Sequence, residues 1–250
     1  MSATVIVDRL EKRRAAKLEK NFSDERREFM NAQNNGKTLS CVDCGSLNCK
    51  KRSGKYPDFC LTQDVTQKEA AELEKLYMDD NENHRVAIAG AQVESEYSGI
   101  YTRVEEIMEF AKQIGARKIG IATCSGLIEE SRVFAKILRF NGFDVYGVIC
   151  KVGSKDKTSI GLEEEYTKTG PVMCNPILQA KKLNEAGTEL NVVVGLCVGH
   201  DSLFYKYAEA LTTTLITKDR VLGHNPAVAL YQTASYYKRL LEKPVVEWND

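Results

Sequence analysis

Short apolar runs alternate with amphipathic segments along the chain from about residue 85 onward. In the segments between the runs, apolar residues recur every three or four positions, which is typical of helices that cover a sheet. Because the runs are apolar throughout, we expect parallel strands that are buried on both faces. The pattern therefore predicts a Rossmann-like, three-layer α/β domain with a mostly parallel sheet over residues 81–250. The predicted strands are residues 86–90, 118–124, 144–150, 191–197 and 212–217.

Several of the predicted helices have recognisable ends. Ser125 is suited to capping the helix that follows the second strand, and Asn175 followed by Pro176 is a common way to start a helix. A closing helix is expected over residues 225–241. These ends separate the helices from the strands that they connect.

The first part of the chain has a different pattern. Residues 8–33 carry interleaved charges of both signs with few apolar positions, which predicts an exposed or partner-packing helix. Such a helix is a candidate surface for forming a homo-oligomer. Residues 66–77 form a second predicted helix with an apolar stripe. We therefore expect a helical extension over residues 1–40 and a cysteine-rich metal module over residues 41–80, followed by the α/β domain.

Composition limits the binding partners and the cellular location that we expect for this protein. Of 250 residues, 43% are hydrophobic, and 35 basic side chains balance 35 acidic ones, so no net field favours nucleic acid or an anionic membrane. No apolar run approaches the roughly 18–20 residues that cross a bilayer. The charged N-terminal stretch also lacks the apolar core of a secretion signal. We expect a cytoplasmic protein that binds neither nucleic acid nor membrane.

The chain contains eight cysteines, which require an explanation. In a reducing compartment disulfides are rare, so metal binding or catalysis is the better interpretation. Four of the eight lie in a polar loop with almost no apolar residue between them. Thiolate binding of a metal is therefore the available source of folding energy for this loop. The predicted metal ligands are Cys41, Cys44, Cys49 and Cys60.

The identity of that metal is left open by the ligands. Four thiolates suit tetrahedral zinc and an iron–sulfur cluster alike. Zinc ribbons usually carry a second close pair, whereas ten residues lie between Cys49 and Cys60. The irregular spacing favours an iron–sulfur cluster of the 4Fe–4S type, with zinc as the alternative.

The other four cysteines share one position within their structural units. Three end predicted strands, and the fourth directly precedes a predicted helix. In a parallel sheet such positions meet in the crevice at the carboxyl ends of the strands, and helix N-termini stabilise thiolates. Core thiols are the competing interpretation, because free cysteine is among the most buried residue types. The candidate ligands of a second cluster or metal are Cys124, Cys150, Cys174 and Cys197.

A polar run beside the last of these cysteines adds candidates for catalysis. His200 follows a strand end and could act as a ligand, a proton donor or an orienting group. Asp201 is suited to the same site or to capping the next helix. Arg220, together with Lys218, would balance the charge of an anionic cluster or substrate, or would lie in a solvated loop. The catalytic candidates are therefore His200, Asp201 and Arg220.

Five motifs carry a resemblance to a known family: Cys41-Val-Asp-Cys44-Gly with Cys49 and Phe59-Cys60, Ala122-Thr-Cys124-Ser-Gly, Leu196-Cys197-Val-Gly-His200-Asp201, Thr217-Lys-Asp-Arg220, and Gly223-His-Asn-Pro226. They resemble the DUF1847 proteins, described as uncharacterised metal-binding proteins of archaea and anaerobic bacteria. The resemblance extends from about residue 41 to the C-terminus. It implies metal binding in an anaerobic setting, which favours oxygen-sensitive iron–sulfur clusters, and it implies no particular reaction.

Three functions follow from these candidates. The first is a redox or electron-transfer protein whose clusters exchange electrons with a redox partner protein. The second is a binding or assembly module in which a structural zinc supports the α/β domain. The third is an enzyme that acts on a small anionic substrate through Cys197, His200 and Arg220. The amounts of iron, sulfide and zinc bound to the chain distinguish the first two.

Overall fold

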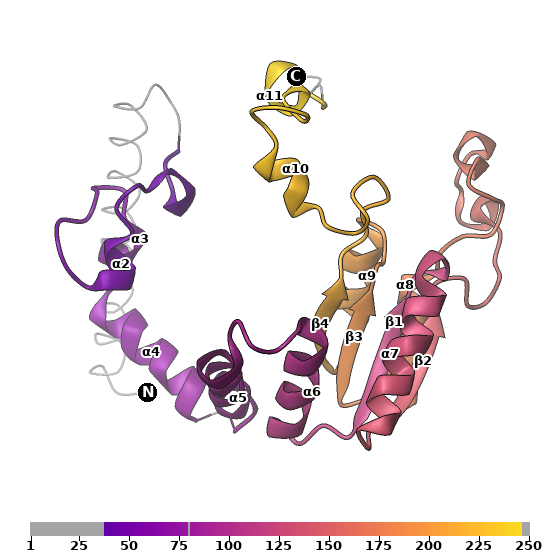
Figure 1. Ribbon diagram of the computed structural model, residues 1–250, viewed down its shortest axis with the longest axis horizontal. Coiled ribbons are helices and arrows are strands. Elements are labelled where there is room, and N and C mark those ends of the chain that lie inside the picture. The colour runs from indigo at the N-terminus through magenta and orange to yellow at the C-terminus, as the bar shows by residue number, and fades with distance from the viewer. Residues whose placement is uncertain (1–37, 80, 247–250) are drawn as a thin grey trace, which may run out of the picture. The chain divides into compact units, whose positions relative to one another are not determined.

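The structure is a computed structural model in which residues 38–79 and 81–246 are described. The chain divides into two compact units, residues 1–80 and 81–250 (Figure 1). The helix predicted over residues 8–33 lies outside the described residues, as does the homo-oligomer surface predicted on it.

The described part of the first unit consists of short helices and turns. None of residues 38–79 is buried, so this stretch has no hydrophobic core of its own. The helix predicted over residues 66–77 is confirmed, and Thr66 caps it. Glu69 N donates to Thr66 Oγ1 at 3.2 Å, and the Glu69 carboxylate accepts from Thr66 N at 2.9 Å. The helices are η1 (Cys41–Asp43), α2 (Asn48–Lys51), α3 (Leu61–Asp64) and α4 (Gln67–Met78).

The second unit is built on a parallel sheet. Among the described residues the sheet has four strands, which lie in the order β2-β1-β3-β4. Every neighbouring pair is parallel, so the predicted α/β fold with a parallel sheet is confirmed, with one strand fewer than expected. The strands are β1 (Lys118–Thr123), β2 (Asp144–Ile149), β3 (Leu190–Val194) and β4 (Leu211–Ile216).

Helices cover both faces of this sheet (Figure 1). Alternate residues of β1 point into different cores, because side chains alternate across a strand. Ile119 and Ile121 pack on the side of α6 and α7, whereas Ala122 packs on the side of α8 and α9. The covering helices are α6 (Arg103–Gln113), α7 (Ile128–Phe140), α8 (Pro176–Glu185) and α9 (His200–Tyr207).

The first predicted strand, residues 86–90, is wrong, because this run lies inside a helix, α5 (Asn81–Tyr97). Ala89 and Val93 are the buried residues of that helix, and their spacing of four places both on one face. The run is also rich in alanine, the strongest helix former. A short apolar run alone cannot distinguish a strand from one face of a helix.

The closing helix predicted over residues 225–241 is also wrong in its length. Two short helices form instead, with a run of turns between them. In those turns the Ser235 hydroxyl donates to Gln232 Oε1 at 2.6 Å, and Tyr237 N donates to Gln232 O at 2.9 Å. Local serine hydrogen bonds of this kind compete with helix formation. The remaining elements are η2 (Ser125–Leu127), η3 (Lys157–Ile160), η4 (Glu164–Thr167), α10 (Ala227–Tyr231) and α11 (Arg239–Glu242).

The order of the strands creates a switch point between β1 and β3. The helix after β1, α7, packs on one face of the sheet, and the helix after β3, α9, packs on the other. The connections from these neighbouring strands therefore diverge, and ligands of open α/β sheets bind in the crevice that such a divergence leaves. Cys124 follows β1 and Cys197 follows β3 at this crevice.

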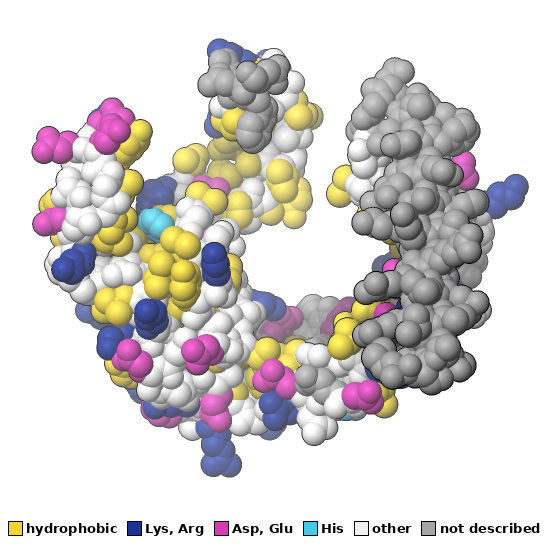
Figure 2. Space-filling view, turned by 180° about the vertical axis from the view of Figure 1, so that it is seen from behind, with side chains coloured by type: hydrophobic (Ala, Val, Ile, Leu, Met, Phe, Trp, Pro, Cys, Tyr) yellow, Lys and Arg dark blue, Asp and Glu magenta, His cyan; other side chains and the backbone are white. Residues whose placement is uncertain are grey.

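The described surface shows charges of both signs. Figure 2 shows Lys and Arg side chains interspersed with Asp and Glu on the visible face of the molecule, in keeping with the equal totals of the sequence. In the described part of the chain, no helix combines the length and the apolar character that crossing a bilayer requires.

Candidate functional site

Cys124 and Cys150 are held by the sheet itself. Cys124 N donates to Val194 O at 3.1 Å, and Cys150 N donates to Thr123 O at 2.8 Å, so each cysteine continues the ladder one residue past its strand. Both side chains are buried. The sequence prediction that these thiols lie at the carboxyl ends of neighbouring strands agrees with their placement.

Cys174 reaches the same place from a loop. Asn175 N donates to Cys150 O at 2.7 Å, which brings the segment before α8 against the end of β2. Asn175 is also the predicted N-cap of α8, and its Oδ1 accepts from Leu178 N at 3.0 Å. Lys151 holds the loop from the other side, because its Nζ donates to Val172 O at 2.6 Å.

Cys150 affects the pKa of both neighbouring thiols. The Cys124 thiol bonds to Cys150, which together with burial raises the pKa of Cys124 to about 12. A second hydrogen bond, from Cys150 to Cys174, lowers the pKa of Cys174 to about 6 against the opposing effect of burial, with Lys151 contributing. Ser125 N donates to Cys150 Sγ at 3.2 Å. Cys150 is thus the central sulfur of the set.

Cys197 joins the site through different partners. Its carbonyl accepts from His200 N at 2.9 Å and Asp201 N at 3.1 Å, and so ties Cys197 to the start of α9. Its Sγ accepts a hydrogen bond from Arg220 Nη2 at 3.2 Å, and this bond raises the pKa of Arg220. Its interaction with Cys174 is electrostatic. The structure therefore places all four predicted cysteines at one edge of the sheet, with Cys150 beside both Cys124 and Cys174.

Two further catalytic candidates lie close by with less defined roles. His200 is the first residue of α9 and is partly buried. The prediction that Asp201 caps α9 is wrong, because Gly199 occupies the cap position with φ 84°. Asp201 lies instead in the first turn, where its Oδ1 accepts from Ser202 N at 2.8 Å. The roles of His200, Asp201 and Arg220 in a reaction stay predictions.

Several residues that shape this site were not among the site residues predicted from the sequence. We expected the Ser125 side chain to cap a helix, and it does not. Ser125 instead donates its backbone N–H to Cys150 Sγ. Lys151 follows the third predicted strand directly, a position that could have marked it as a member of the site. Gln179 sits in the middle of an amphipathic helix and carries no sequence signal at all.

Gln179 supports the strand ends that carry the thiols. It is fully buried, and its Nε2 donates to Thr123 O at 3.1 Å and Val148 O at 2.7 Å. We expect Gln179→Leu to lower the free energy of unfolding by about 1–2 kcal/mol, because both hydrogen bonds are lost in a buried place. Urea denaturation measures the change. Gln113→Leu, which removes one hydrogen bond from a partly buried helix residue to Glu109, is the control, and equal effects of the two variants would contradict this role.

The low pKa of Cys174 gives a second expected result. In the metal-free, reduced chain, alkylation of Cys174 by iodoacetamide should be half-maximal near pH 6, because the reactive thiolate is present above the pKa of about 6 and lost below it. Cys124, with a pKa of about 12, should react slowly at neutral pH. Peptide mass spectrometry measures both rates. Cys150→Ala should move the Cys174 midpoint upward, and a midpoint unaffected by that change would contradict the hydrogen bond.

The four cysteines of the first unit are less enclosed. Cys41 and Cys49 are exposed, and Cys44 and Cys60 are partly buried. A hydrogen bond with Ser46 lowers the pKa of Cys44. Across the described residues of both units, no group of three or more His, Cys, Asp or Glu side chains is already arranged to hold a metal ion. Metal binding by either cysteine set stays a prediction.

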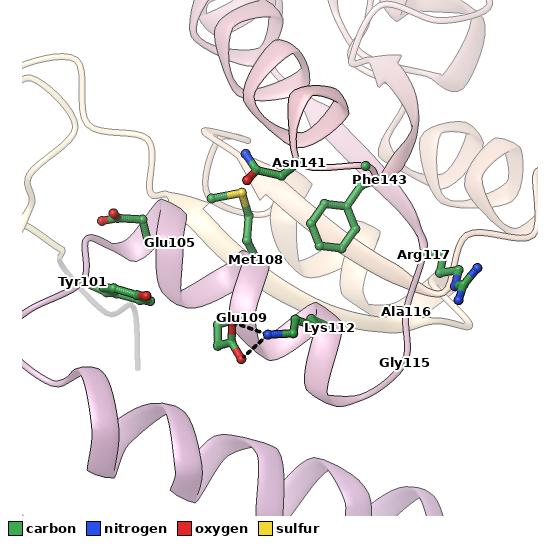
Figure 3. A pocket seen from close by; sticks show the side chains of 11 residues that line it. Tyr101, Glu105, Met108, Glu109, Lys112, Gly115, Ala116, Arg117, Asn141 and Phe143 are labelled. Atoms are coloured by element: carbon green, nitrogen blue, oxygen red, sulfur yellow. Dashed lines mark hydrogen bonds and ion pairs between the residues drawn. The ribbon is translucent and has the colours of Figure 1, made fainter.

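A cavity lies elsewhere, at the opposite edge of the sheet. It measures about 650 Å³ and is lined by α6 and by the segments that lead into β1 and β2. Figure 3 shows Met108 and Phe143 facing this space, with Glu109 and Lys112 paired at its side. Because ligands of parallel sheets bind at the carboxyl edge, and no cysteine lines the cavity, we place the candidate site at the thiols.

Comparison with known proteins adds relatives without an assigned activity. The sequence signature of a family described as "Protein of unknown function (DUF1847)" matches residues 60–215. An uncharacterized protein of Methanocaldococcus jannaschii is 45% identical over 204 residues, which are 82% of this chain and 99% of that protein. No solved structure matches the chain. The matched region includes every cysteine of the sheet edge.

Proposed function

The chain belongs to the DUF1847 family of proteins of unknown function, and we propose that it binds a thiolate-held metal centre at the carboxyl edge of its sheet. One observation carries this proposal. Cys124, Cys150 and Cys174 come from three separate segments, and backbone hydrogen bonds bring these segments together at the carboxyl edge of the sheet, from Cys150 N to Thr123 O and from Asn175 N to Cys150 O. Thiols that are merely core residues need no such common meeting place.

The residues at this edge fit an anionic metal–thiolate centre. Thiolates are soft ligands that select zinc and iron–sulfur clusters. Sulfurs of such centres accept hydrogen bonds from the protein, as Cys150 does from Ser125 N. Lys151 also lies beside a thiol and would offset negative charge. Metal binding releases the protons that now join the sulfurs, which frees these side chains to turn toward the metal.

We propose an iron–sulfur cluster of the 4Fe–4S type as the centre, with zinc as the alternative. When bound, such a cluster supplies one-electron transfer. Cys174 is partly exposed, so the centre would lie near the surface, where a redox partner protein could approach it. A zinc centre in the same place would support the fold without redox chemistry.

A second thiolate centre is proposed in the first unit, at Cys41, Cys44, Cys49 and Cys60. The supporting observation is the lack of any buried residue over residues 38–79. A folded stretch without a hydrophobic core requires another source of stability, and metal binding by four thiolates supplies it.

Metal analysis after anaerobic purification and reconstitution tests the proposal. We expect iron and acid-labile sulfide at about four per cluster, with a visible absorption band that is lost on reduction. Zinc in a colourless solution would support the alternative. A full-length, reduced chain that retains neither iron nor zinc after exposure to each metal would overturn the proposal.

A further inference from the structure

Cys197 stands apart from the other three cysteines in its hydrogen bonding. Cys150 interacts with both Cys124 and Cys174, whereas the Sγ of Cys197 accepts from Arg220 Nη2 at 3.2 Å. Cys197 is also partly exposed, while Cys124 and Cys150 are buried. It therefore lies at the mouth of the thiol cluster, between the buried sulfurs and solvent.

Two cations face this mouth without a carboxylate partner. Within the part of the chain that the structure describes, no Asp or Glu forms an ion pair with Lys218 or Arg220. The nearest acidic residue in sequence, Asp219, is turned to the backbone, where its Oδ1 accepts from Val221 N at 2.9 Å and Leu222 N at 2.8 Å. The local charge is therefore positive and uncompensated by carboxylates.

Lys218 approaches the thiols beside Gly126. A Cβ atom at this position would lie 3.6 Å from Lys218 Nζ and 4.0 Å from Cys124 Sγ, so the cation and the sulfur both lie close to the Gly126 backbone. Lys218 is thus directed at the thiols, where its charge lowers the pKa of Cys124 against larger opposing effects. Each cation therefore lies close to a sulfur, Lys218 beside Cys124 and Arg220 beside Cys197.

We propose that the mouth of the thiol cluster binds a small anion such as a carboxylate, held by Lys218 and Arg220 and facing Cys197, whose sulfur stays outside the metal ligand set. A guanidinium matches the two oxygens of a carboxylate through paired hydrogen bonds. The inference rests on the proposed function, because it leaves the metal to Cys124, Cys150 and Cys174. The site would then bind a small anionic ligand, and the accessible thiol of Cys197 would lie beside that ligand.

Alkylation with a matched pair of probes tests this inference on the full-length, metal-loaded chain under anaerobic conditions. Iodoacetate is an anion and iodoacetamide is its neutral counterpart. With either probe the sulfur forms a thioether, iodide leaves, and the thiol proton passes to solvent. We expect alkylation of Cys197, with Cys124, Cys150 and Cys174 protected by the metal. Peptide mass spectrometry gives the rate at each cysteine.

The ratio of the iodoacetate rate to the iodoacetamide rate at Cys197 reports the anion site. We expect Arg220→Gln to lower this ratio about fivefold and Lys218→Gln to lower it less, in line with single ion pairs near a surface. Added salt should also lower the ratio in the wild-type chain. Lys112→Gln removes the same charge at the opposite edge of the sheet and should leave the ratio unchanged.

The outcomes separate this inference from the proposed function. Protection of Cys197 together with the other three sulfurs, or equal ratios in all variants, overturns the inference while leaving the metal centre in place. A chain that binds no metal but keeps the charge-dependent ratio at Cys197 overturns the metal centre and supports the anion position.

Discussion

Cys150→Ser should remove the metal centre from the sheet edge and leave the α/β unit folded. Cys150 is the central sulfur, because it bonds to both Cys124 and Cys174 and also accepts from Ser125 N. A serine oxygen is a poor substitute for a thiolate with zinc or an iron–sulfur cluster. If both centres form, the variant should lose about half of the bound metal. Iron, sulfide and zinc analysis of the reconstituted chain gives the result.

Two control variants make this result specific. Cys44→Ser should remove the centre of the first unit and spare the one at the sheet, so the two variants should lose metal separately. Ser125→Ala keeps the backbone N–H that bonds to Cys150 and should bind metal as the wild-type chain does. If Cys150→Ser retains all its metal and shows only a lower free energy of unfolding, Cys150 is a core residue.

The parts of the fold that the sequence predicted well are those where several signals agree. β1, β2 and β3 combine an apolar run with a following helix of clear periodicity, and all three form as parallel strands. Residues 86–90 have only the apolar run, and their helix is revealed by the spacing of Ala89 and Val93 beyond it. The closing segment has apolar residues in helical spacing, but local serine hydrogen bonds interrupt it.

The candidate site likewise has features that the sequence predicted and features that it did not. The four cysteines could be placed at one edge because strand ends in a parallel sheet converge whatever the loops do. The partners of the individual cysteines could not be predicted. They depend on the loop between β2 and α8 and on the turn that carries Lys218 and Arg220 toward the thiols. Backbone contributions such as Ser125 N leave no trace in residue type. Strand ends are set by topology, and loop contacts are set by tertiary structure.

Gly195→Ala should be the most destabilising single-methyl change near the site. Gly195 joins β3 to Cys197 with φ 64°, and an added Cβ would lie 1.9 Å from Leu127 Cδ1. Leu127 is only 1% exposed and cannot move out of the way without disturbing the core. Backbone strain and overpacking together should lower the free energy of unfolding by about 2–4 kcal/mol. Urea denaturation of the metal-free chain isolates this effect from metal binding.

Two further variants separate the causes. Gly115 also has a positive φ, 76°, with no atom within 4 Å of an added Cβ, so Gly115→Ala should cost only the backbone term of about 1–2 kcal/mol. In the Gly195→Ala background, Leu127→Ala opens the space that the new methyl group requires. Leu127→Ala should therefore lower the free energy of unfolding less in this background than in the wild-type chain. Equal costs in both backgrounds would show that Gly195 and Leu127 do not compete for that space. In that case, the close packing of Gly195 on Leu127 would not explain how the chain turns from β3 toward the thiols.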